Sequence, residues 1–245
     1  MNGSELAGTT ALVTGASRGF GRGIATALTR AGAQVTGVAR DRGPLDELRA
    51  ELGGSFTAVA ADAADPNVAG RLIDACKPRI LVLNAGATPL PRPIQQHTWE
   101  TFGRNWDVDV RHVFGWTREA LLAPLAPGSI VITLSSGAAL RGSPLSGGYA
   151  GAKAAIRWLT AYAAQESARA GFGIRFVSLL PQLTPATELG AVFAAAYAGR
   201  AGGPAGDQGP ALTPERVGQA VIELVTGTDP GQDAYLLTAA GLRPL

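Results

Sequence analysis

Short apolar runs alternate with helical patterns along this chain, and that alternation constrains the fold more than any other feature. The apolar runs are short enough for buried strands and lie at residues 9–14, 34–39, 56–61, 80–83, 129–134, 174–180 and 234–238. The helical patterns between them lie at about 22–30, 44–52, 67–76, 97–122, 148–170, 187–198 and 213–225. Strands that alternate with helices in this way predict an α/β fold with a parallel, doubly wound sheet.

Length and composition narrow the class further. The chain has 245 residues, a net charge of +2 and one cysteine, Cys76. We expect a single domain over residues 1–245, because no second core pattern is visible. One cysteine cannot form an internal disulfide, and the scattered basic residues do not favour nucleic-acid binding. Since neither a signal segment nor a membrane span is recognisable, we expect a cytoplasmic protein, and no metal site is predicted.

The first strand runs into a glycine-rich turn and then into a helix. A strand, a turn without side chains and a helix N-terminus together form an anion site, because free N–H groups point at the phosphates. The spacing is Gly-x-x-x-Gly-x-Gly rather than the commoner Gly-x-Gly-x-x-Gly. The turn predicts a dinucleotide site that includes Gly15, Ser17, Arg18, Gly19, Phe20 and Gly21.

The residues at the end of the second strand indicate whether the dinucleotide is NAD or NADP. Folds that select NAD place a carboxylate here for the ribose 2′-hydroxyl, whereas this chain reads Ala39-Arg40-Asp41. Arg40 suits a 2′-phosphate, and Arg18 can close on the same group. We therefore expect NADP(H) rather than NAD(H), with Asp41 as the feature that argues the other way.

Two further strands end in polar or small residues. Asp62 and Ala63 follow the third strand, and Asn84, Ala85 and Gly86 follow the fourth. Ligands of such sheets bind at the carboxyl ends of the strands. We expect Asp62 to reach an adenine edge at the end where Gly15, Arg40 and Asn84 also lie.

Tyr149 and Lys153 are four residues apart in the helical pattern at 148–170, so they share one face of the helix. A neighbouring ammonium lowers the pKa of a phenol, which makes such a pair a proton donor or acceptor for an alcohol or carbonyl. A serine hydroxyl in Ser135-Ser136 can hydrogen-bond a substrate oxygen. A stripe from Trp99 to Val113 indicates core or a subunit interface, and His97 and His112 are expected to be structural or surface residues.

These residues resemble the classical short-chain dehydrogenase/reductase family over nearly the whole chain, in order and at family spacing. The resemblance rests on the glycine turn, Asp62, Asn84-Ala85-Gly86, Ser136, Tyr149 and Lys153. It implies a Rossmann-type domain with about seven strands, and a homodimer or homotetramer packed through the two long helices. It implies Tyr149 as acid/base, Ser136 as the residue that orients the carbonyl, and Lys153 as the group that binds the nicotinamide ribose. The arginine pair is similar to that of NADP-preferring members.

Three positions depart from the family pattern. Asp109 stands where the family has an asparagine that fixes a water beside the lysine, and a direct pair with Lys153 would offset the lysine's field. Gln182 follows Pro181 where a glycine is usual. The threonine that contacts the carboxamide is displaced, with Thr184 and Thr187 as candidates.

The sequence therefore predicts an NADPH-dependent oxidoreductase that reduces a ketone or aldehyde, or runs the reverse reaction, with Tyr149 as general acid/base. Two alternatives remain: an NADP(H)-binding regulator without turnover, and a non-redox dehydratase, isomerase or cyclase. Residues 182–212 are expected to form a flap over the site. The expected pocket walls are mostly apolar, which favours an uncharged, hydrophobic carbonyl or alcohol substrate.

Overall fold

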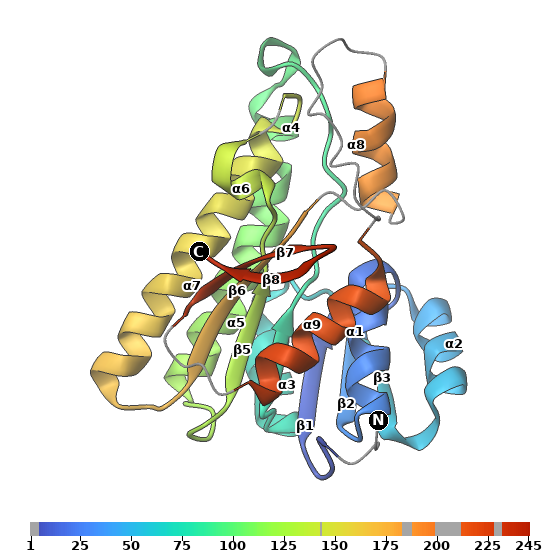
Figure 1. Ribbon diagram of the computed structural model, residues 1–245, viewed down its shortest axis with the longest axis vertical. Coiled ribbons are helices and arrows are strands. Elements are labelled where there is room, and N and C mark those ends of the chain that lie inside the picture. The colour runs from blue at the N-terminus through green and yellow to red at the C-terminus, as the bar shows by residue number, and fades with distance from the viewer. Residues whose placement is uncertain (1–4, 143, 183–187, 199–211, 228–231) are drawn as a thin grey trace.

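The central feature of the computed structural model is an eight-stranded sheet (Figure 1). The structure describes residues 5–142, 144–182, 188–198, 212–227 and 232–245. The strand order is β3-β2-β1-β4-β5-β6-β7-β8, and β1 to β7 pair in parallel. The strands are β1 Thr10–Thr14, β2 Gln34–Ala39, β3 Phe56–Ala60, β4 Ile80–Leu83, β5 Ile130–Leu134, β6 Arg175–Pro181, β7 Ala234–Thr238 and β8 Gly241–Pro244.

The strand order reverses between β1 and β4, which are neighbours in the sheet but far apart in the chain. In a doubly wound sheet this switch point opens a crevice at the carboxyl ends of the strands. The predicted doubly wound α/β sheet is confirmed. The prediction of about seven strands omitted β8, which pairs antiparallel with β7 after a tight turn.

The helices are α1 Gly19–Arg30, α2 Arg42–Leu52, α3 Pro66–Cys76, α4 Trp99–Asn105, α5 Arg111–Leu122, α6 Ala138–Arg141, α7 Gly147–Ala170, α8 Glu188–Ala198 and α9 Pro214–Thr226. Short 3-10 turns lie at Gly53–Ser55 and Ile94–Gln96. The single helix predicted over residues 97–122 is instead three segments, because a π-helical turn, Trp106–Val110, separates α4 from α5.

Several helices begin where the sequence supplies a cap. Asp65 accepts a hydrogen bond from the N–H of Asn67 at the start of α3. Thr98 and Thr101 form a reciprocal capping box at the start of α4. Thr213 caps α9 ahead of a proline at its first position. These contacts satisfy backbone N–H groups that have no partner inside the helix.

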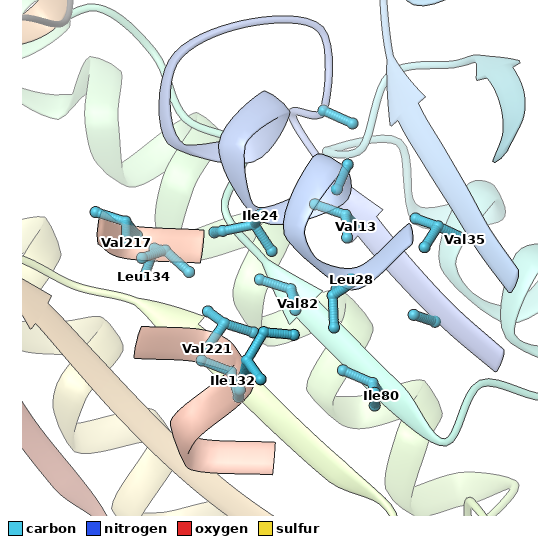
Figure 2. Close-up of a cluster of buried hydrophobic side chains, with 14 of the residues drawn as sticks. Val13, Ile24, Leu28, Val35, Ile80, Val82, Ile132, Leu134, Val217 and Val221 are labelled. Atoms are coloured by element: carbon cyan, nitrogen blue, oxygen red, sulfur yellow. The ribbon is translucent and has the colours of Figure 1, made fainter. Parts of the chain in front are cut away.

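The core lies on both faces of the sheet, because successive side chains of a strand point to opposite faces. Val13, Val82 and Ile132 pack on one face with α1, α2 and α9 (Figure 2). Leu12 and Val131 point to the other face and pack with α3, α5 and α7. Strands buried on both faces explain the continuous apolar runs in the sequence.

The aromatic stripe predicted between Trp99 and Val113 does not form one buried surface. Val113 is buried, whereas Trp99 is 81% exposed and Trp106 is 39% exposed. Core packing is therefore wrong for these two tryptophans, and the other alternative, a subunit interface, stays a prediction. Among the described helices, none combines the length and apolar character needed to cross a bilayer.

Candidate active site

The turn between β1 and α1 requires glycine at particular positions. Gly15 has a φ of 67°, and a Cβ on it would lie 2.8 Å from Nδ2 of Asn84. A Cβ on Gly21 would lie 2.0 Å from the carbonyl oxygen of Gly15. Gly19, with a φ of 53°, has no atom within 4 Å of its Cβ position, so its backbone borders open space. The turn thus leaves room for a phosphate at the N-terminus of α1.

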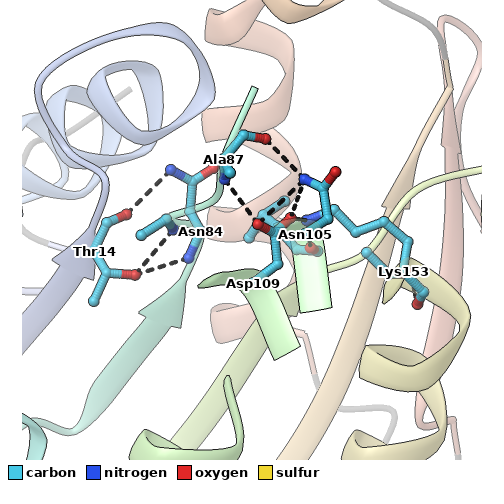
Figure 3. Close-up of polar contacts among 9 residues, drawn as sticks. Thr14, Asn84, Ala87, Asn105, Asp109 and Lys153 are labelled. Atoms are coloured by element: carbon cyan, nitrogen blue, oxygen red, sulfur yellow. Dashed lines mark hydrogen bonds and ion pairs between the residues drawn. The ribbon is translucent and has the colours of Figure 1, made fainter. Parts of the chain in front are cut away.

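Asn84 joins this turn to the end of β4. Its Nδ2 donates to the carbonyl oxygens of Thr14 at 3.1 Å and Gly15 at 3.2 Å (Figure 3). Its backbone N–H donates to Oγ1 of Thr14 at 2.9 Å, and the N–H of Ala85 donates to the same oxygen at 3.2 Å. The two strand ends at the switch point are therefore held in a fixed relation.

A cavity of about 520 Å³ opens at these strand ends. Most residues predicted from the sequence to bind a cofactor line it. They are Gly15, Ser17, Arg18, Gly19, Phe20, Arg40, Asp62, Ala63, Asn84, Ala85, Gly86, Tyr149 and Lys153. Gly21 lies behind the turn. Pro181 ends β6 beside β7, and the N–H of Gln182, the next residue, donates to the carbonyl oxygen of Leu237 on β7. Thr184 and Thr187 are outside the described residues, as is most of the expected flap at 182–212.

The end of β2 brings charged side chains to the cavity. Arg40 follows the buried Ala39, is exposed, and lines the cavity with Arg18 and Asp41. Asp41 stands at the N-cap of α2, but its side chain makes no capping hydrogen bond. Two arginines and one carboxylate are therefore among the residues that line the cavity.

The π-helical turn places Asp109 inside the protein, with its side chain 1% exposed. Oδ1 of Asp109 accepts a hydrogen bond of 2.7 Å from the N–H of Ala87, just beyond β4 (Figure 3). Nδ2 of Asn105 donates to the carbonyl oxygen of Ala87 at 2.9 Å and lies 3.4 Å from Oδ1 of Asp109. A Cβ on Gly86 would lie 2.9 Å from Oδ2 of Asp109. Asp109 is thus packed against the end of β4.

Lys153 forms a direct ion pair with Asp109, the arrangement that the sequence left open. Its Nζ lies 3.2 Å from Oδ2 of Asp109 and donates to the carbonyl oxygen of Leu134 at 3.1 Å. Burial alone lowers the pKa of Lys153, but attraction to Asp109 and Tyr149 outweighs burial and raises the pKa above its ordinary value. The lysine is therefore a firmly held ammonium.

Tyr149 lies one helical turn before Lys153 and is 9% exposed. Nζ of Lys153 is 5.6 Å from the centroid of the tyrosine ring. The ring of Phe193 from α8 lies against it, with 5.6 Å between ring centroids and 48° between the planes. The hydroxyl of Tyr197 on α8 donates to the carbonyl oxygen of Pro144 at 2.7 Å. The two links hold α8 over Tyr149.

The two serines after β5 have different surroundings. Oγ of Ser135 is buried and donates to the carbonyl oxygen of Lys153 at 2.7 Å. Oγ of Ser136 is partly buried and accepts from the N–H of Ala138 at 3.2 Å. Ser135 thus anchors the helix that carries Lys153, and Ser136 retains its hydroxyl hydrogen for another acceptor.

His112 was missed as a site residue by sequence reasoning. It is 1% exposed and lines the cavity with Asp109 and Lys153. Burial and the positive charge of Lys153 lower the pKa of His112 to about 3, so the ring is neutral. Its position three residues after Asp109, on the same helical face, was the available signal.

Comparisons with known proteins place this geometry in a family. A model of the family described as short chain dehydrogenase matches residues 9–197. L-xylulose reductase of Bos taurus is 35% identical over 165 residues, covering 66% of this chain and 67% of that protein. Carbonyl reductase (NADPH) 2 of Sus scrofa is 34% identical over 165 residues, with the same two coverages. The matches thus span about two thirds of these relatives.

A solved structure agrees over a longer stretch. The 3-ketoacyl-(acyl-carrier-protein) reductase of Brucella melitensis, described as complexed with NADH, has a TM-score of 0.76 and 27% identity. The similarity covers 92% of this chain and 95% of that one. The family match extends over the glycine turn, the end of β4, and the helix that carries Tyr149 and Lys153. This chain belongs to the short chain dehydrogenase family.

Proposed function

We propose that this protein is an NADPH-dependent oxidoreductase that reduces a ketone or aldehyde to an alcohol, or catalyses the reverse oxidation. One observation carries the proposal: Tyr149 and Lys153 line the same cavity as the glycine turn. A proton-donating pair thus shares one space with a phosphate-binding helix N-terminus. The similar bovine and porcine proteins are both described as reductases, which supports carbonyl reduction as the activity of this chain.

The residues present fit a nicotinamide dinucleotide. The open backbone at Gly19 and the N-terminus of α1 suit its pyrophosphate. Asp62 and Ala63 suit its adenine edge, and Asn84 to Gly86 lie toward Lys153, where the nicotinamide end belongs. When bound, the cofactor supplies a hydride. The cavity also has the apolar walls that ligand sites generally show, at Val38, Ala61 and Leu134.

The charges at the end of β2 support NADP(H) over NAD(H). Arg40 and Arg18 both line the cavity, and an arginine at the end of the second strand pairs with a 2′-phosphate. The printed name of the porcine relative includes NADPH, whereas the Brucella structure contains NADH. The comparisons therefore support a nicotinamide cofactor. The preference for NADP(H) over NAD(H) rests on Arg40 and Arg18.

Tyr149 and the side chains around it have separate roles in transferring a proton to the substrate oxygen. Tyr149 donates its hydroxyl proton to the substrate oxygen as negative charge develops there. Ser136 donates a hydrogen bond to the same oxygen. Lys153 stays charged next to Tyr149 because Asp109 compensates its burial. The net reaction joins one hydride and one proton to the carbonyl group.

Phe193 bears on the substrate class. Its side chain is 3% exposed and packs against the ring of Tyr149. The substrate must then approach Tyr149 beside an aromatic wall. This supports an uncharged, fairly hydrophobic carbonyl compound over a polyanion.

The experiment that tests the proposal uses Tyr149→Phe. The variant should bind NADPH with unchanged affinity in a fluorescence titration, because only a hydroxyl is removed. Its turnover on a panel of ketones and aldehydes should fall by about 10²–10⁴-fold, the range for loss of a general acid. Tyr162→Phe is the matched control, since Tyr162 lies on the same helix and is 48% exposed. Full activity in Tyr149→Phe would refute the role.

One observation favours a second candidate, an NADP(H)-binding regulator without turnover. The direct contact of Asp109 with Lys153 offsets part of the positive field that Tyr149 experiences. The same titration and substrate panel separate the two functions. Tight NADPH binding by the wild-type protein, with no oxidation of NADPH by any carbonyl compound, would favour the regulator.

A further inference from the structure

A second cavity lies outside the crevice at the strand ends. Its volume is about 340 Å³, and none of the described residues that line it also lines the 520 Å³ cavity. Three segments form it: the loop that follows β4, the helix α4, and the chain just before α7 with the first residue of that helix. The N–H of Arg92 in the loop donates to the carbonyl oxygen of Leu145, before α7, at 3.0 Å. A backbone hydrogen bond therefore joins two sides of this second cavity.

Most of its wall is apolar. Pro93 and Ile94 come from the loop, Phe102 from α4, and Leu145 from the segment before α7. The ring of Phe102 meets the ring of His97 edge-on, with 6.0 Å between ring centroids and 84° between the planes. Ligand pockets generally have apolar and aromatic walls with a few polar groups, and volumes from about 300 Å³ upward. The second cavity is at the small end of that range, which suits a small ligand with an apolar body.

Large apolar side chains at this cavity are left uncovered by the protein. Ile94 lines it and is 76% exposed. Trp99 is 81% exposed and stacks on Phe102, with 6.0 Å between ring centroids and 29° between the planes. Exposed apolar groups gathered beside a hollow are typical of ligand-binding grooves. An apolar body seated on Phe102 and Ile94 would remove part of this surface from water.

The polar groups of the lining favour an anion. They are Arg92, Gln95 and His97, and none of the described lining residues is acidic. Arg92 is exposed, and its guanidinium has no carboxylate partner within the described part of the chain. An arginine binds a carboxylate through two parallel N–H···O bonds. Gly147, the first residue of α7, also lines the cavity, and the positive end of that helix dipole reinforces the preference.

We propose that this second cavity binds a small organic monocarboxylate. The carboxylate pairs with Arg92, and an apolar or aromatic body lies against Phe102 and Ile94. Since Arg92 is the one arginine in the described lining, a single negative charge matches it better than a phosphate ester or a dicarboxylate. The inference goes beyond the proposed function, because none of these residues has a role in hydride or proton transfer.

Isothermal titration calorimetry with three probes separates the two halves of the site. Phenylacetate has both the charge and the apolar body, and should bind with a Kd of about 1 mM or lower. Phenylacetamide keeps the body without the charge, and acetate keeps the charge without the body. Each should bind more weakly by about tenfold or more. Equal affinity for phenylacetamide and phenylacetate, or no binding of phenylacetate up to about 10 mM, would overturn the proposal.

Two variants test the residues directly. Arg92→Gln should raise the Kd of phenylacetate by about tenfold or more and leave that of phenylacetamide unchanged. Arg111→Gln is the matched control, since Arg111 is also exposed but lines neither of the two cavities. Ile94→Glu puts a carboxylate into the lining at an exposed position and should abolish phenylacetate binding by repulsion. An unchanged Kd in Arg92→Gln or in Ile94→Glu would overturn the site.

Two further readouts locate the bound probe. Because Trp99 stacks on Phe102, phenylacetate should change the tryptophan fluorescence, and Trp99→Phe should lose this change while the heat of binding persists. Saturating NADPH should leave the Kd of phenylacetate unchanged, since the two cavities share no described lining residue. A Kd that rises with NADPH, or a fluorescence change retained in Trp99→Phe, would place the probe elsewhere and overturn the proposal. If the protein reduces no carbonyl compound, the reductase function fails, while the phenylacetate titrations still decide this site.

Discussion

Nζ of Lys153 and Oδ2 of Asp109 lie 3.2 Å apart, and the side chains are 8% and 1% exposed. Both charges are thus almost fully removed from water. A buried charge is tolerated when it is paired and hydrogen-bonded, and loss of one partner leaves the other uncompensated. The pair also connects α7 to the end of β4, because Asp109 accepts a hydrogen bond from Ala87. Stability and protonation at the site therefore depend on the same contact.

Asp109→Asn should separate these two consequences. Loss of the carboxylate should reduce the free energy of unfolding by about 3 kcal/mol, as for one partner of a buried ion pair. It should also remove the attraction that raises the pKa of Lys153, so the alkaline limb of the kcat/KM profile should move to lower pH. Asp107→Asn is the matched control, because Asp107 is exposed on the same π-helical turn. Urea unfolding and a pH–rate series measure both effects.

Two results would contradict this account. If Asp109→Asn has the same free energy of unfolding as the wild type, the charge of Lys153 does not depend on the Asp109 carboxylate for its compensation. An alkaline limb at unchanged pH would mean that Asp109 does not control the protonation of Lys153. Asp107→Asn should change stability by less than about 0.5 kcal/mol, which is usual for an exposed substitution.

Arg40→Ala should distinguish the two nicotinamide cofactors. A charge-assisted pair with a phosphate contributes about 1.5–3 kcal/mol, so the Kd of NADPH should rise by roughly 10–100-fold. The Kd of NADH should stay nearly constant, because NADH has no 2′-phosphate. Arg42→Ala is the control, since Arg42 is close in sequence but pairs with Asp46 at 3.2 Å. Equal losses for NADPH and NADH would show that Arg40 does not select the cofactor.

An exposed aromatic face leads to a prediction about assembly. Trp158 is 64% exposed and Tyr162 is 48% exposed on α7, while Phe114 is 54% exposed on α5. The helices α5 and α7 contact each other (Figure 1). Exposed aromatic patches often mark protein interfaces, and we expect a second copy of the chain to cover this one. Trp158→Glu should raise the dimer Kd at least about tenfold, as for loss of a central aromatic anchor.

Light scattering across a dilution series measures that change in mass. Ile94→Glu is a suitable control, because Ile94 is 76% exposed but lies in a 3-10 turn outside α5 and α7. A wild-type protein that is monomeric at all concentrations would refute the expected homo-oligomer. An oligomer that is equally stable in Trp158→Glu would place the interface elsewhere.

The sequence predicted the regular parts of the fold well, because each depends on local pattern. The strands are continuous apolar runs with punctuating turns, and Gly15 occupies a backbone conformation that strongly favours glycine. β8 was missed because Gly241 to Pro244 is short and ends in proline, which is tolerated on an edge strand. The same locality explains why the helical pattern at 213–225 agrees with α9, which begins at a local cap from Thr213 followed by Pro214.

The site was less predictable, since its contacts join residues distant in the chain. The π-helical turn has no recognisable sequence signature, yet it sets where Asp109 points. The sequence therefore left open whether Asp109 meets Lys153 directly. His112 was treated as structural or surface because its burial beside the cavity that Lys153 lines is visible only once α5 and α7 are packed together. Whether Ser136 orients the substrate stays a prediction.

The last prediction concerns acid stability. Because the pKa of His112 is about 3 in the folded protein and 6.5 is its ordinary value, the unfolded chain binds a proton between these limits that the folded chain does not. The free energy of unfolding therefore falls as pH drops below 6.5, approaching about 1.4 kcal/mol per pH unit from this group. His112→Gln and His112→Phe should both lack this contribution, whatever their stability near pH 7. Urea unfolding of the three proteins near pH 7, 6 and 5 measures the difference, and parallel pH dependences would show that His112 is protonated alike in both states.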